Sequence, residues 1–134
     1  MDNKKENIFI RTFIAKNKRN RMEYELKNSQ KRNVAIHRFA HRAEDHILEN
    51  KIYFYGKNLI FNECLLNIEG FCKPSKVYVL CNSDDIDGTY LDYKEAMELD
   101  NRYAPYILLV NNNIACIVTE PMSGSYNRYI LRNI

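Results

Sequence analysis

The sequence predicts an α+β fold, in which N-terminal helices pack on a mostly antiparallel sheet of about four to five strands. Two observations favour this class. Apolar residues recur at helical spacing in the first 50 residues, and β-prone runs separated by Asn-containing turns dominate residues 51–134. With 134 residues, the chain is expected to form a single domain with a basic helical half (1–50) and a sheet-rich half (51–134).

Two helices are expected in the first half. Helical spacing favours a first helix over residues 4–26, although residues 8–15 also fit an alternating strand. Asn28 and Ser29 offer an N-cap for a second helix, and Asn50 offers a left-handed stop. The apolar stripe of this second helix is the clearest amphipathic pattern in the chain and consists of Ile36, Phe39, Ala40, Ala43 and Ile47.

The second half is expected to alternate short elements and turns. We predict strands at residues 51–55, 77–81, 106–110, 114–119 and 126–132, and a short helix within 62–70. Asp92 and Glu95 have the spacing of a capping box, so a further helix is expected to begin there. Asn111-Asn112-Asn113 suits a hairpin loop because Asn tolerates positive φ, and residues 121–125 suit another turn.

Charge is distributed unevenly along the chain. Residues 1–42 carry twelve Lys and Arg against four Asp and Glu, whereas residues 43–134 carry eight against thirteen. The net charge of +3 therefore hides a basic front and an acidic back. This split fits a nucleic-acid or acidic-protein partner, and it also fits two halves that attract each other within the fold.

The basic side chains supply the candidate partner-binding surface. The candidates are Arg19, Arg21, Lys31, Arg32, Arg38, Arg42, Arg128 and Arg132. The six in the helical half would form a face for phosphate groups, although charged helix faces are more often simply solvated. The two on the last strand would form a second contact surface or protect an edge strand by charge.

The second helix also carries the candidate catalytic residues His37, His41 and Asp45. The two histidines are four residues apart and share a helix face, and Asp45 follows about one turn later. Such a set suits a general base or metal ligands, but histidines beside an apolar stripe also serve as ordinary helix-edge residues. The sequence contains no H-E-x-x-H, P-loop or G-x-G-x-x-G motif, and we expect neither a bound metal nor a cofactor.

An acidic segment, Ser83 to Gly88, has part of the pattern of a calcium loop. Lys94 stands at the twelfth position, where an EF-hand requires a bidentate Glu, and the flanking segments are a predicted strand and a short helix. The segment is therefore expected to be an acidic turn.

The sequence contains four cysteines and no C-x-x-C pair: Cys64, Cys72, Cys81 and Cys116. All lie within or beside apolar stretches, so buried free thiols are expected. The apolar stretch at residues 8–15 is interrupted by Arg11 and is too short for a bilayer. We therefore expect no membrane contact and a cytoplasmic location.

Six stretches of the chain form a distinctive combination: Phe9 to Ile14, Lys18 to Arg21, Lys31-Arg32, Phe39-Ala40-His41, Val77 to Leu80 and Asp84 to Gly88. The pattern resembles a group of small uncharacterised bacterial proteins and covers most of the chain. The resemblance implies one bacterial domain, with His41 and the turn at Asp84 to Gly88 as positions of interest. It implies no activity.

The charge asymmetry, the ten tyrosines and the lack of a coherent catalytic set favour a binding function. We expect a small intracellular binding or regulatory protein whose basic helical half engages an acidic partner, protein or nucleic acid, in an immunity or defence setting. The alternative is a hydrolase or nuclease that uses His37, His41 and Asp45 as base or metal ligands. A third hypothesis is an assembly role through a tyrosine-rich sheet face.

Overall fold

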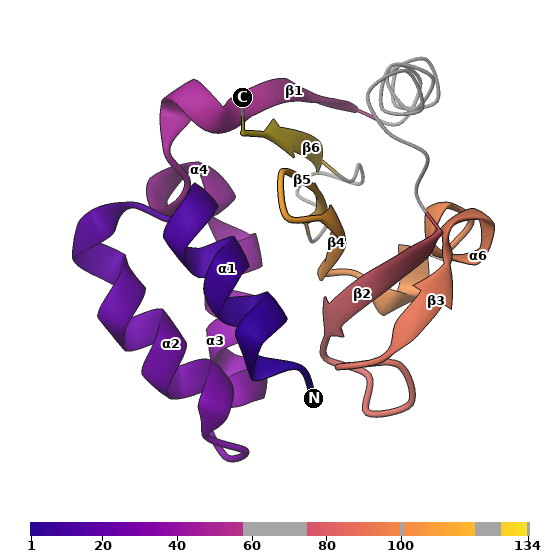
Figure 1. Cartoon of the computed structure of the whole chain (residues 1–134), viewed down its shortest axis with the longest axis horizontal. Helices are drawn as coiled ribbons and strands as arrows, with labels where there is room; N and C mark the ends of the chain where they lie inside the picture. The colour runs from indigo at the N-terminus through magenta and orange to yellow at the C-terminus, as the bar shows by residue number, and fades with distance from the viewer. Residues whose placement is uncertain (58–74, 100, 120–126, 134) are drawn as a thin grey trace.

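The structure, a computed structural model, describes residues 1–57, 75–99, 101–119 and 127–133. Helical elements come first along the chain: α1 (Asn3–Phe13), η1 (Lys16–Lys18), α2 (Arg19–Lys27), α3 (Arg32–His41), α4 (Ala43–His46) and η2 (Glu49–Lys51). The elements that follow are β1 (Ile52–Lys57), β2 (Lys76–Cys81), β3 (Tyr90–Asp92), α6 (Tyr93–Met97), η3 (Asn101–Tyr103), β4 (Tyr106–Asn111), β5 (Ile114–Val118) and β6 (Asn127–Arg132). Figure 1 shows α1 to α4 gathered on one side of the sheet, with α6 beside β3.

The strands of the described residues form one sheet of six strands in the order β1-β6-β5-β4-β2-β3. Every neighbouring pair is antiparallel. The predicted α+β class is thus confirmed, with a strand count slightly higher than expected. The strand that sequence patterns missed is β3, which has only three residues and runs directly into the helix predicted at Asp92.

Side chains on the two faces of the sheet belong to two separate cores. On one face, Tyr78, Leu80 and Ile107 pack against the apolar stripes of the helices. On the other face, Val77, Val79 and their neighbours pack with Ala96 of α6 and with residues near η3. Alternating strand residues therefore have buried positions on both sides, which explains the continuous apolar runs in β2, β4 and β5.

The helical half is closed by a short bridge between Ile14 and Ile47. The amide of Ala15 donates to the carbonyl of His46 over 2.7 Å, and the amide of Leu48 donates to the carbonyl of Phe13 over 2.8 Å. This bridge interrupts the helix expected over residues 4–26, because Ile14 takes an extended conformation with ψ 141°. Both interpretations of residues 8–15 were therefore partly right: the segment is helical to Phe13 and extended at Ile14.

The stripe predicted for the second helix is confirmed, since all five of its residues are buried. The helix itself begins later than expected, at Arg32, and breaks at Arg42, where φ is −137° and ψ is 65°. It ends at His46, so the predicted stop at Asn50 is wrong, and Asn50 lies in η2.

The strands predicted at 51–55, 77–81, 106–110, 114–119 and 126–132 correspond to β1, β2, β4, β5 and β6, with ends shifted by one or two residues. The hairpin loop is present, and the amide of Asn113 donates to the side chain of Asn111 over 2.8 Å. Asp92 is the N-cap of α6, but its side chain does not cap the helix and pairs with Lys76 instead. The helix predicted within 62–70 and the turn at 121–125 lie outside the described residues.

Two of the four cysteines, Cys81 and Cys116, are described, and both are buried and free of disulfides, as expected. Burial raises the pKa of the Cys81 thiol to about 11. Within the described residues, no helix has the length and apolar character needed to cross a membrane.

Candidate functional site

A cavity of about 310 Å³ lies between α2 and α3. It is lined by Asn17, Lys18, Arg21, Met22, Ala35, Arg38, Phe39 and His46. Three of these side chains are cations, and three form an apolar floor that belongs to the helical core. The helices converge here because their apolar stripes pack together, which leaves the flanking basic residues around the rim.

The two arginines of the cavity share one carboxylate. Glu25 accepts from both terminal nitrogens of Arg38, at Nη1 over 3.1 Å, and it accepts from Nε of Arg21 over 3.0 Å. The hydrogen bond from Arg38 lowers the pKa of Glu25, which burial alone would raise. Because Glu25 lies along one edge of the Arg38 guanidinium, the Nε edge is not used by this pair. The Arg38 side chain is 34% exposed and the Arg21 side chain 71% exposed.

Lys18 and His46 complete the rim. The Lys18 ammonium donates to the carbonyl of Asp45 over 2.8 Å, which fixes it beside the start of α2. The imidazole of His46 packs on Phe39 with ring centroids 5.6 Å apart. Burial lowers the pKa of His46, and the positive charges of Lys18 and Arg38 lower it further. The site therefore favours the neutral imidazole while it is surrounded by cations.

The other predicted basic residues of the helical half lie elsewhere. Arg19 is half-buried and donates from Nε to the carbonyl of Ile14 over 2.8 Å. The Lys31 ammonium lies 5.1 Å from the ring centre of Tyr24. Arg42 is exposed and lies 3.6 Å from Asp45. Of the six predicted residues, the structure brings only Arg21 and Arg38 together at the cavity.

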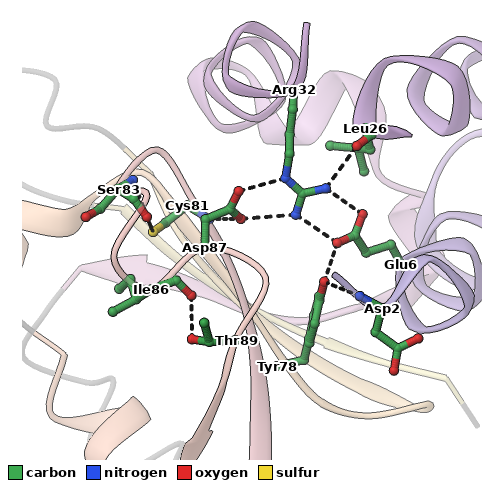
Figure 2. Close-up of polar contacts among 10 residues, drawn as sticks. All are labelled: Asp2, Glu6, Leu26, Arg32, Tyr78, Cys81, Ser83, Ile86, Asp87 and Thr89. Carbon is green, nitrogen blue, oxygen red and sulfur yellow. Dashed lines mark hydrogen bonds and ion pairs between the residues drawn. The ribbon is translucent and has the colours of Figure 1, made fainter. Parts of the chain in front are cut away.

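Arg32 was predicted to contact a partner, and this prediction is wrong for the folded chain. Its side chain is only 3% exposed, and its guanidinium makes five hydrogen bonds (Figure 2). Two bonds go to Glu6 of α1, two to Asp87, and one to the carbonyl of Leu26. All five donors of the guanidinium are thus used inside the protein. The hydrogen bonds and charges of both carboxylates outweigh the effect of burial and raise the pKa of Arg32.

Donors around the two carboxylates extend this buried network. The hydroxyl of Tyr78 donates to Glu6 and accepts from the amide of Asp2 over 3.0 Å, while the amide of Cys81 donates to Asp87 over 3.1 Å. Figure 2 shows these groups converging from α1, α3, β2 and the turn after it. Since two carboxylates face one guanidinium, these additional donors help to stabilise the second negative charge.

The network gives the predicted acidic turn a structural role. Asp87 is buried, whereas Asp84 and Asp85 are exposed. Gly88 follows with φ of +73°, a left-handed conformation that a side chain disfavours, and a Cβ at this position would lie 2.7 Å from Met1. The turn thus positions the Asp87 carboxylate beside Arg32, and its Gly88 lies against Met1 at the start of the chain.

Arg128 and Arg132 lie on β6, in the sheet-rich half, and both are half-buried. The guanidinium of Arg132 lies 4.6 Å from the ring centre of Tyr53 on the neighbouring strand β1. Neither residue lines the cavity between α2 and α3.

The candidate catalytic residues are spread along the end of the helical half. His37 is exposed and lies beside an open hollow, and its Nδ1 is 3.4 Å from Nδ2 of the Asn82 side chain. His41 is exposed at the end of α3, and Asp45 pairs with Arg42 on α4. Among residues 1–57, 75–99, 101–119 and 127–133, no three His, Cys, Asp or Glu side chains lie close enough together to hold a metal ion.

Sequence reasoning missed two residues of the cavity rim, Lys18 and His46. Lys18 and Arg21 are three residues apart, so helical spacing places them on one face. His46 follows Phe39 by two helical turns, which is a second usable signal. The two pairs meet at the cavity because α2 packs against α3, and no local pattern predicts this contact.

No family model, curated protein or solved structure matches the chain, so no relative supplies a function. The resemblance to small bacterial proteins stays a prediction.

Proposed function

We propose that the chain is a small binding protein that engages an acidic partner through its helical half. The observation that carries this proposal is the convergence of Lys18, Arg21 and Arg38 around one cavity. Glu25 pairs with both arginines, and the other nearby acid, Asp45, pairs with Arg42, so positive charge is in surplus at this place on the surface. Such a surplus attracts acidic groups and orients them as they approach.

The exposure of these cations supports a binding role over a purely structural one. Arg32 is buried, and all its guanidinium donors form hydrogen bonds within the protein, whereas the Arg21 side chain is 71% exposed. An exposed ion pair contributes little to stability, so Arg21 can exchange Glu25 for an incoming acidic group at small cost. Basic residues in this half therefore have two kinds of surroundings: Arg32 is enclosed within the fold, and the cations at the cavity stay accessible and lie close together.

No specific observation favours the hydrolase or nuclease hypothesis. In the part of the chain that the structure describes, His37, His41 and Asp45 belong to no group of three side chains that could hold a metal ion. His37 instead contacts Asn82 beside a different hollow.

Arg21 has a closely matched control in Arg11. Arg11 is 72% exposed and pairs with Glu23 over 3.1 Å, while Arg21 is 71% exposed and pairs with Glu25 over 3.0 Å. Arg11 lies on α1 and does not line the cavity. Arg11→Gln and Arg21→Gln therefore remove the same charge from two comparable exposed pairs.

The test uses two fluorescent probes, poly-glutamate and a single-stranded DNA 20-mer, titrated with the protein at several salt concentrations. We expect at least one probe to bind and its affinity to fall with salt. Arg21→Gln should weaken binding several-fold more than Arg11→Gln. The proposal fails if neither probe binds at low salt, or if the two variants weaken binding equally. The probe that binds identifies the class of partner.

A further inference from the structure

The cavity between α2 and α3 is large enough for more than a surface ion pair. Its volume of about 310 Å³ lies at the lower end of the range typical of small-molecule sites. Its floor is apolar and is formed by Met22, Ala35 and Phe39, all buried in the helical core. A site with an apolar floor and a charged rim suits a ligand that has an apolar body and an ionic end.

The charge of the rim indicates the ionic end. Lys18, Arg21 and Arg38 are cations, and Glu25 pairs with both arginines. Asp45, which also faces His46, pairs with Arg42 outside the lining. Two of the three lining cations therefore remain without a neutralising carboxylate. A phosphate monoester carries a charge of about −1.5 to −2 at pH 7 and matches this surplus better than a carboxylate does. The planar fork of an arginine also suits phosphate oxygens.

The aromatic side chains of the cavity indicate which kind of apolar group the ligand carries. The rings of Phe39 and His46 pack at 5.6 Å with their planes inclined by 38°, and both line the cavity. A flat ring inserted beside this pair would gain apolar and aromatic contacts without separating the helices.

We propose that this cavity binds a small phosphate monoester that carries a ring, up to about the size of a mononucleotide. This inference rests on the proposed function and specifies the acidic group that the helical half recognises. Arg21, Arg38 and Lys18 would hold the phosphate, and Phe39 and His46 would contact the ring.

Binding should be visible at His46. The charged groups that face its imidazole are Lys18 of η1, Arg21 of α2, Arg38 of α3 and Asp45 of α4. The three cations disfavour its protonation, together with burial. A bound dianion would oppose these cations, so the pKa of His46 should rise when the ligand is present.

The experiment compares phenyl phosphate and adenosine 5′-monophosphate with benzoate, inorganic phosphate and a DNA 20-mer that lacks a 5′-phosphate. Binding is measured by calorimetry at low salt, and the His46 pKa is followed by NMR. We expect both ring-bearing monoesters to bind at least about tenfold more tightly than benzoate or inorganic phosphate, since these lack the second charge or the ring. We also expect the His46 pKa to rise. Equal binding of benzoate, or no binding of either monoester, would overturn the proposal.

Two variants separate the cavity from the surface charge around it. Ala35→Leu narrows the cavity and keeps every charge, so it should weaken binding of phenyl phosphate at least about tenfold while binding of the polyanionic probe persists. Arg21→Gln should weaken phenyl phosphate about tenfold, and Arg11→Gln should leave its affinity unchanged. Circular dichroism checks that each variant is folded. If the polyanion binds the natural chain and phenyl phosphate does not, this inference fails and the proposed function stands. If Ala35→Leu is folded and binds phenyl phosphate with unchanged affinity, the cavity is not the site.

Discussion

Arg32 and Arg38 lie on the same helix, α3, and each pairs with at least one carboxylate, but their surroundings differ. Arg32 is enclosed by Glu6 and Asp87, which come from α1 and the turn after β2. Arg38 pairs with Glu25, from the adjacent helix α2, and is 34% exposed. The first arrangement joins the helical half to the sheet. The second joins two helices and leaves part of the guanidinium facing a cavity.

Charged residues of the helical half therefore occur in two different settings, a buried network and a cavity rim. The front of the chain is basic and the back acidic, and two explanations of that split were open: internal attraction or an external partner. The pair between Arg32 and Asp87 is an internal attraction between the two halves. Two cations of the cavity, Arg21 and Arg38, pair with Glu25, which belongs to the helical half itself. The internal explanation therefore applies to Arg32, and the external one is our proposal for the cations of the cavity.

The largest expected effect comes from replacing Arg32. Arg32→Lys keeps the charge but supplies at most three donors without the planar fork, and Arg32→Gln leaves two buried carboxylates facing each other. Removing one partner from a buried ionic network costs about 3–5 kcal/mol. We expect Arg32→Gln to lower the free energy of unfolding by an amount of this order, measured by urea denaturation, with a smaller loss for Arg32→Lys.

Arg11→Gln is the control for this experiment, because it also removes one arginine from an ion pair but at an exposed site. Its effect on the free energy of unfolding should stay within about 0.5 kcal/mol. If Arg32→Gln lost no more stability than Arg11→Gln, the buried network would contribute nothing to stability and the comparison between Arg32 and Arg38 would be wrong.

An intermediate effect is expected at Arg38. Arg38→Gln leaves Glu25, a largely buried carboxylate, with only the exposed Arg21. The loss at neutral pH should be about 1–2 kcal/mol, between the values for exposed and buried pairs. Arg38 lowers the pKa of Glu25, so its contribution is present above the ordinary carboxyl pKa of 4.5 and is lost as the pH falls through the lower folded value.

The measurement for Arg38 is the difference in unfolding free energy between the natural chain and Arg38→Gln, followed from pH 7 downwards. We expect the difference to shrink below about pH 4.5 as Glu25 becomes protonated. A difference that stays constant across this range would show that Arg38 stabilises the fold through packing of its alkyl chain and not through Glu25.

Helical spacing contains part of the information that distinguishes the two arginines. Arg32 precedes Ile36 by four residues and thus continues the apolar stripe of its helix, whereas Arg38 falls beside the stripe. Glu6 likewise precedes Phe9 and Ile10, two buried residues of α1. A charged residue in line with an apolar stripe at each of two helices is a usable signal of a buried ion pair.

The third member of the network was not accessible from local patterns. Asp87 lies in a turn with two other aspartates, and only the path of the chain after β2 decides which of them is buried. The same limit applies to the cavity. The sequence identifies α2 and α3 and their basic residues, but Lys18 and His46 come after the breaks at Ile14 and Arg42, which local patterns do not show. Those breaks depend on tertiary hydrogen bonds such as the bridge to Ile47.

The sheet was easier to predict because its strands are marked locally. The hairpin of β4 and β5 has two apolar runs around an Asn loop, and both runs are buried on both faces. The strand β3 has three residues and no apolar run, so it becomes a strand only by pairing with β2.

The smallest expected effect is at His46 on the rim of the cavity, because the protonation of its imidazole makes the stability of the fold depend on pH. Burial, with Lys18 and Arg38, lowers the pKa of His46 below its ordinary value of 6.5. Between these two pKa values the unfolded chain binds more protons than the folded chain, so the free energy of unfolding falls as the pH drops below about 6.5. His46→Phe keeps a ring against Phe39 and removes the titration, so it should flatten this dependence between about pH 5 and 7.5. If His46→Phe retains the full pH dependence, the cations of the rim do not act on His46, and the charge surplus assigned to the cavity is screened by solvent.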